Sequence, residues 1–239
     1  MNENQWGRTL TLAAAIVLAG GAVGAGLVQF RAADRSVSVK GVAERTVKAD
    51  VALWPLRFVA AENDLDAAQH KIEADRRTVL RFLERSGVDS THVELQGFEV
   101  QDTRTNPYQG GVAPARYIIT ATLMVRSSDP DRIQQASQRV GELVSGGVVL
   151  TGGGWSSGPT FLFTRLNDLK PAMLAEATAN ARKAAEEFAR ESHSAVGGIQ
   201  RAQQGVFEIL PRDPAPGIQQ EGQMQKTLRV VTTVEYRLR

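Results

Sequence analysis

The stretch Tyr117-Ile118-Ile119-Thr120-Ala121-Thr122-Leu123-Met124-Val125 has the clearest alternation in the chain. Every second side chain from Tyr117 onward is apolar or aromatic, and side chains with a period of two lie on one face of a β-strand. The stretch therefore predicts a long strand with one covered face. The same period at 93–101 predicts a second strand, and the turn-forming residues of 102–114 between the two are typical of a hairpin tip.

Two further strands and a helix are predicted upstream of this pair. The strands cover 36–44 and 50–61, and Pro55 lies in the middle of the second. Because proline cannot donate to a strand ladder, we expect an edge position or a bulge there. From Asp64 the apolar spacing changes to three and four, which predicts a helix that ends at a glycine cap, Gly87.

The second half of the chain predicts two helices between short strands. Asp129-Pro130 is typical of a helix start, and this helix is expected to end at Gly146-Gly147. A strand at 160–164 is followed by a third helix, which Asn167 or Asp168 is expected to cap. We expect that helix to lie close against a sheet through a slim face made of Ala177, Ala181, Ala184, Ala185 and Phe188.

Strands at 206–210 and 228–238 complete the chain, separated by a loop that begins with Pro211. The order β-β-α-β-β-α-β-α-β-β has too few helices for a doubly wound parallel sheet. It predicts an α+β fold with helices packed on antiparallel sheet.

Residues 9–30 carry no charge. As a helix they would be about 33 Å long, enough to cross a hydrocarbon core of about 30 Å. We therefore expect an N-terminal anchor or signal peptide at 1–35 and an exported domain at 36–239. Both forms stay open, because the small residues of Ala22-Val23-Gly24 resemble a cleavage site inside an apolar stretch that is long for a signal peptide.

The composition limits the chemistry and the partners. Of the 239 residues, 42% are hydrophobic and 23% charged, and the formal net charge is only +2 without any clustered basic segment, so no nucleic acid partner is expected. The chain has no cysteine, which excludes disulfides and thiolate chemistry.

The sharpest enzymatic motif is Gly154-Trp155-Ser156-Ser157-Gly158, which fits the nucleophile elbow G-x-S-x-G. Asp168 and His193 follow in the order of α/β-hydrolases. An elbow needs a strand before the serine and a helix after it, whereas here glycines precede it and a strand follows. We favour a glycine turn and keep a serine hydrolase using Ser156 as the alternative.

Other catalytic, metal and cofactor sites are not predicted. The three histidines lie far apart and lack zinc-binding spacing: they are His70, His92 and His193. Glu62, Asp64 and Asp66 stand at a helix start, where acidic residues favour the helix dipole. We therefore expect no cofactor and no metal, and no residue is assigned to catalysis.

Several packing signatures recur along the chain, namely Val37-x-Val39-x-Gly41, Lys48-Ala49-Asp50-Val51-Ala52, Gly87-Val88, Tyr117-x-Ile119-x-Ala121-x-Leu123-x-Val125, Phe161-x-Phe163 and the alanines around Ala181-Arg182. Through these residues, the segment 36 to 239 resembles the SIMPL domain family of bacterial envelope proteins. The sequence departs from the family pattern at Pro55, at Arg116 and in the long loop 211–225. The resemblance implies an exported α+β domain that tends to self-assemble, has no established catalytic residues and is associated with envelope or oxidative stress.

These observations together predict a non-catalytic membrane-anchored or exported envelope protein. We expect it to form a homo-oligomer or to bind a protein partner. The expected loci are the hairpin tip at 106–114 and the loop at 211–224, since both are rich in turn-forming residues. The expected location is the bacterial inner membrane with the main domain in the periplasm, or the periplasm itself after cleavage.

Overall fold

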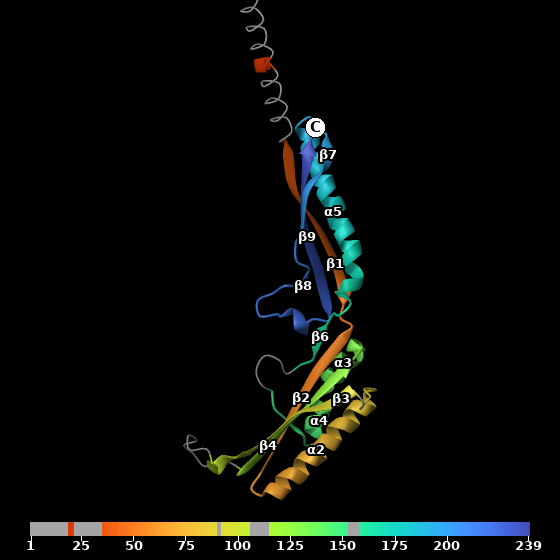
Figure 1. Ribbon diagram of the computed structural model, residues 1–239. Coiled ribbons are helices and arrows are strands. Elements are labelled where there is room, and N and C mark those ends of the chain that lie inside the picture. Colours follow the sequence, from red (N-terminus) through yellow and green to blue (C-terminus); the bar gives the residue numbers. More distant parts are fainter. Residues whose placement is uncertain (1–18, 22–34, 90–91, 106–114, 153–157) are drawn as a thin grey trace, which may run out of the picture. The chain divides into compact units, whose positions relative to one another are not determined.

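The computed structural model describes residues 19–21, 35–89, 92–105, 115–152 and 158–239 (Figure 1). The chain divides into two compact units. Unit 1 contains residues 1–44, 171–207 and 229–239, and unit 2 contains residues 45–170 and 208–228. Each has antiparallel strands and a covering helix, which confirms the predicted α+β class.

No helix within the described part of the chain is both long enough and apolar enough to cross a lipid bilayer. The predicted segment 9–30 lies outside the described residues except for 19–21.

Unit 2 is built on a five-stranded sheet with the order β3-β4-β2-β5, in which β6 also pairs with β2. The strands are β2 (Val51–Glu62), β3 (Val93–Asp102), β4 (Tyr117–Ser127), β5 (Val149–Leu150) and β6 (Thr160–Leu162). β2 and β4 pair without interruption from Ala52↔Ser127 to Glu62↔Tyr117. The alternation that predicted β4 is confirmed, because Ile119, Ala121, Leu123 and Val125 are all buried.

Helix α2 (Leu65–Arg85) packs against the buried face of β2 and β4. Trp54 of β2 meets Phe82 of α2 edge to face, with 6.4 Å between the ring centroids. The Asp64 carboxylate caps the helix by accepting from the Ala67 amide at 2.9 Å. Gly87 takes a φ of 76° after the last turn, which confirms the predicted glycine cap.

The single helix predicted from Asp129 to Gly146 is wrong, because two helices occupy this stretch, α3 (Pro130–Gln138) and α4 (Gly141–Ser145). At the break the amides of Arg139 and Val140 donate to carbonyls three residues back, at 3.0 and 3.3 Å. Gly141, a poor helix former, follows directly. The predicted start holds, with the Asp129 carboxylate accepting from the Arg132 amide.

The expectation of an edge strand or a bulge at Pro55 is also wrong. Pro55 pairs with Met124 inside an unbroken ladder, and β2 has strands on both sides. On the second side, however, β6 pairs with 51–53 and β5 with 58–59. Among the described residues no strand pairs with Pro55 on that side, so its missing N–H interrupts no ladder there.

Unit 1 takes its strands from a sheet with the order β1-β9-β7, and β8 also pairs with β9. Its elements are β1 (Ser36–Lys48), α5 (Leu166–Glu191), β7 (Val196–Gln204) and β9 (Gln225–Leu238), whereas β8 (Glu208–Pro211) belongs to unit 2. The unit boundaries fall inside β1, α5 and β9. The core of the unit joins Val39, Ala181, Ala185, Val234 and Tyr236.

The slim alanine face of α5 is confirmed in its main part and wrong in one residue. The buried stripe repeats every four residues, as Met173, Ala177, Ala181, Ala185 and Ala189. Phe188 is 60% exposed, because the four-residue repeat places it beside this stripe. The expected caps are wrong as well, since α5 begins at Leu166 and both Asn167 and Asp168 lie in its first turn.

The strand predicted at 206–210 is shifted, because β8 covers 208–211 and Val206, 80% exposed, precedes it. β7 was not predicted. Seven of its nine residues, from Gly198 onward, are exposed, so they give no alternating apolar signal. The short 3₁₀ helices η2 (Thr103–Thr105) and η4 (Gln220–Gly222) complete the described elements.

Candidate interaction surface

The outer strand of the unit 2 sheet carries an exposed apolar stripe. Leu95, Phe98 and Val100 of β3 are 51%, 50% and 50% exposed. They pair with Leu123, Ala121 and Ile119 of β4, and directly opposed side chains lie on the same face of a sheet. The stripe therefore extends the buried face of β4 to the edge of the sheet, where half of each side chain remains exposed.

A β-bulge aligns this stripe. The pairing with β4 shifts between Leu95 and Gly97, which leaves Gln96 as the extra residue of β3. Without the extra residue, Leu95 and Phe98 would point to opposite faces, because they are three positions apart. Sequence reasoning missed the bulge, although a glycine inside a strand pattern, here Gly97, is its usual signal.

The free edge of β3 has few of the features that prevent strands from pairing. Natural edge strands are protected by lysine, proline, short length or bulges. β3 has ten residues and contains neither lysine nor proline. Its protection consists of the bulge and of acidic residues, one of which, Glu99, lies 3.9 Å from the Arg57 guanidinium on the opposite face. Among the described residues, β3 pairs with β4 alone.

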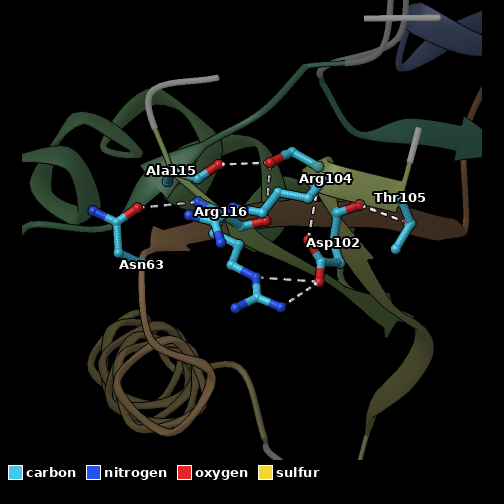
Figure 2. A network of polar contacts seen from close by, with 7 residues as sticks. Asn63, Asp102, Arg104, Thr105, Ala115 and Arg116 are labelled. Atoms are coloured by element: carbon cyan, nitrogen blue, oxygen red, sulfur yellow. Dashed lines mark hydrogen bonds and ion pairs between the residues drawn. The ribbon is translucent and has the colours of Figure 1, made fainter. Parts of the chain in front are cut away.

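A polar network holds together the end of β3 and the start of β4, as Figure 2 shows. We call it the clasp and define it as Asn63, Asp102, Thr103, Arg104 and Arg116. The Asp102 carboxylate accepts from the Arg104 amide at 3.0 Å and from the Arg116 guanidinium at 3.2 and 3.3 Å. The Thr103 amide donates to the Arg116 carbonyl at 2.9 Å, and the Arg116 amide donates to the Asn63 side chain at 3.2 Å.

The clasp also sets the charge state of its members. The hydrogen bond from the Arg104 amide, followed by that from the Arg116 guanidinium, holds the pKa of Asp102 below its ordinary value. Arg116 also lies over the Tyr117 ring, 4.7 Å from its centroid. Arg116, one of the departures from the family pattern, is therefore the residue that fixes the two strand ends. Residues 106–114, the predicted hairpin tip between them, lie outside the described residues.

The structure describes two of the three residues of the hydrolase alternative. Ser156 lies outside the described residues. Asp168 is in the first turn of α5, and its amide donates to the Arg165 carbonyl at 3.2 Å. His193 follows the end of α5 with a φ of 51°. Within the described part of the chain, no group of three histidine or acidic residues is placed to hold a metal ion.

Comparison with known families gives one match. The family model SIMPL, described as a protein of unknown function (DUF541), matches residues 37–236. No curated protein matches the chain.

Proposed function

The chain belongs to the SIMPL family, and from this premise we propose that it is a non-catalytic protein of the bacterial envelope that self-associates through the free edge of β3. The family model is described as a protein of unknown function, so the proposal rests on the sequence and the structure of this chain. The observation that carries the proposal is the half-exposed stripe of Leu95, Phe98 and Val100 on an outer strand of ten residues. A long apolar edge strand is a template for pairing with another chain.

The pairing follows from the symmetry of the edge. Two β3 strands that run antiparallel around a two-fold axis normal to the sheet place the same face of each sheet on the same side. The apolar stripe of one copy then lies beside that of its partner, and both lose their exposure to water. The backbone groups of both edges are satisfied in the same step.

Cross-linking of the full chain in its membrane tests this pairing. The chain has no cysteine, so a single substitution provides a unique reactive site. Gln96→Cys, on the free edge of β3, is expected to give covalent dimers with a short bismaleimide. Val206→Cys is the matched control, because Val206 is the most exposed large apolar residue described and lies outside β3. Equal dimer yields from the two variants would contradict the proposal.

An esterase assay tests the absence of catalysis. We expect no hydrolysis of a generic nitrophenyl ester by the wild-type chain, and the same result for Ser156→Ala. Activity in the wild type that Ser156→Ala abolishes and Ser157→Ala retains would establish the serine hydrolase instead.

The proposed location is the inner membrane with the domain in the periplasm, or the periplasm after cleavage. The uncharged stretch 9–30 supports it. Mass spectrometry of the mature N-terminus is expected to find either the intact segment or a cut among the small residues near Ala22. A role in envelope or oxidative stress rests on the family resemblance alone, and it predicts that a deletion strain is sensitive to peroxide or to detergent.

A further inference from the structure

Unit 2 contains a cavity of about 520 Å³ that neither the β3 edge nor the clasp uses. Its walls come from α3, from the start of β6 and from the loop around η4. This volume is within the range of small-molecule sites in proteins, about 300–1,000 Å³. Figure 1 shows η4 beside β6, and the two are in contact.

The loop around η4 is held in place from several sides. The Gln223 side chain accepts from the Asp213 amide at 3.1 Å and donates to the Asp213 carbonyl at 2.8 Å. The buried Lys226 ammonium donates to the Gln220 carbonyl, and the Ala49 amide donates to the Met224 carbonyl at 2.8 Å. The loop around η4 therefore forms its wall of the cavity before any ligand arrives, which lowers the entropy cost of binding.

Three side-chain amides in the lining of the cavity are exposed to solvent and have no partner among the described residues. Gln134 and Gln138 stand one helical turn apart on α3, and Gln219 faces the same cavity from the η4 loop. Their side chains make no hydrogen bond with another residue of the described chain. Each amide offers both donors and acceptors, as the hydroxyl groups of a sugar also do.

The remaining lining selects against ions. Among the described lining residues Glu221 is the only ionisable one, and its carboxylate already accepts from the Gln220 side chain at 2.8 Å. A wall without lysine or arginine gives an anion no counter-charge. Pro159, Phe161 and Ile218 supply the apolar area, which suits the C–H face of a sugar ring.

We propose that this cavity binds a neutral saccharide. A peptide is the weaker fit, because peptide recognition uses strand edges or grooves, whereas here the free polar groups are side-chain amides on a helix and a loop. The site is independent of the proposed pairing at β3, so either proposal can fail while the other stands.

Saturation-transfer NMR on the full chain tests the proposal with chitotriose and maltotriose as probes at about 1 mM. At least one of them is expected to receive saturation. The double variant Gln134→Leu/Gln138→Leu is expected to bind the sugar at least about tenfold more weakly than the wild type, because it removes two hydrogen-bonding amides. Gln135→Leu is the matched control, since Gln135 is exposed on α3 as Gln134 and Gln138 are, but does not line the cavity.

Three results would overturn the proposal. Neither sugar binds, or binding is the same in the double variant, or a tripeptide such as trialanine or inorganic phosphate binds in place of the sugars and is lost in the double variant. Should the double variant fail to fold by circular dichroism, Gln219→Leu on the opposite wall carries the same expectation.

Discussion

Replacement of Gly41 by alanine tests how closely β1 approaches α5 in unit 1. A Cβ atom at this position would lie 1.9 Å from the Ala177 carbonyl oxygen and 2.5 Å from the Ala181 amide nitrogen. Both are backbone atoms of a helix, so neither can turn aside as a flexible side chain would. Ordinary contact begins at 3.4 Å, and the two elements would have to separate by about 1.5 Å, the difference between 3.4 Å and 1.9 Å.

Overpacking a close-packed core costs about 1–3 kcal/mol, and we expect Gly41→Ala to lie at the upper end because backbone must move. For a chain of this length, about 3 kcal/mol lowers the Tm by about 6–12 °C. Thermal unfolding followed by circular dichroism measures the effect. Gly198→Ala in β7 is the control, because a Cβ there meets nothing within 4 Å. If Gly41→Ala has the same Tm as the wild type, β1 does not approach α5 as closely as described.

Three further predictions concern charged residues that hydrogen-bond to other parts of the chain, namely Asp50, Lys226 and Arg116. Burial raises the pKa of Asp50, but hydrogen bonds from the Thr164 amide and hydroxyl and from Arg165 outweigh it and leave the pKa lowered. The Asp50 carboxylate contributes stability that is fully present above its pKa in the unfolded chain, about 3.9. This stability is lost as the pH falls through the lower pKa of the folded chain. The urea midpoint of unfolding should therefore fall less with decreasing pH in Asp50→Asn than in the wild type. The same pH dependence of the midpoint in both proteins would contradict this. Lys226→Ala is expected to lower the free energy of unfolding in urea by about 2–4 kcal/mol, because it leaves a cavity and an unpaired Gln220 carbonyl. Lys226→Met fills the space and should lose less than half as much. Equal losses in the two variants would refute the packing role of the Lys226 stem. Arg116→Ala should accelerate hydrogen exchange at the Thr103 and Arg104 amides, and unchanged exchange would show that the clasp does not hold the strand ends.

The elements that sequence predicted best have one strong period and clear ends. β4 alternates over nine residues and buries one face from Ile119 to Val125. α2 begins at an aspartate cap and ends at a glycine with positive φ. In both, local preference and packing agree, so the pattern alone identifies the element.

The missed features depend on partners that no local pattern reveals. β5 has two residues, too few to show a period. Pro55 is accommodated in an interior strand because β5 and β6 leave a gap beside it, and this gap is a property of the assembled sheet. The exposed apolar stripe on β3 was not predicted for the same reason. The alternation in β3 predicts a strand, but its place at the edge and the bulge at Gln96 come from its pairing with β4.

The molar mass of residues 36–239 by light scattering on a sizing column tests self-association through β3 most directly. Both hydrophobic cores lie within this segment. We predict a dimer for the wild type, and a monomer for Phe98→Glu, which places a charge in the centre of the apolar stripe. Val206→Glu should leave the dimer intact. A wild-type monomer at every concentration, or a dimer that Phe98→Glu does not change, would contradict the account.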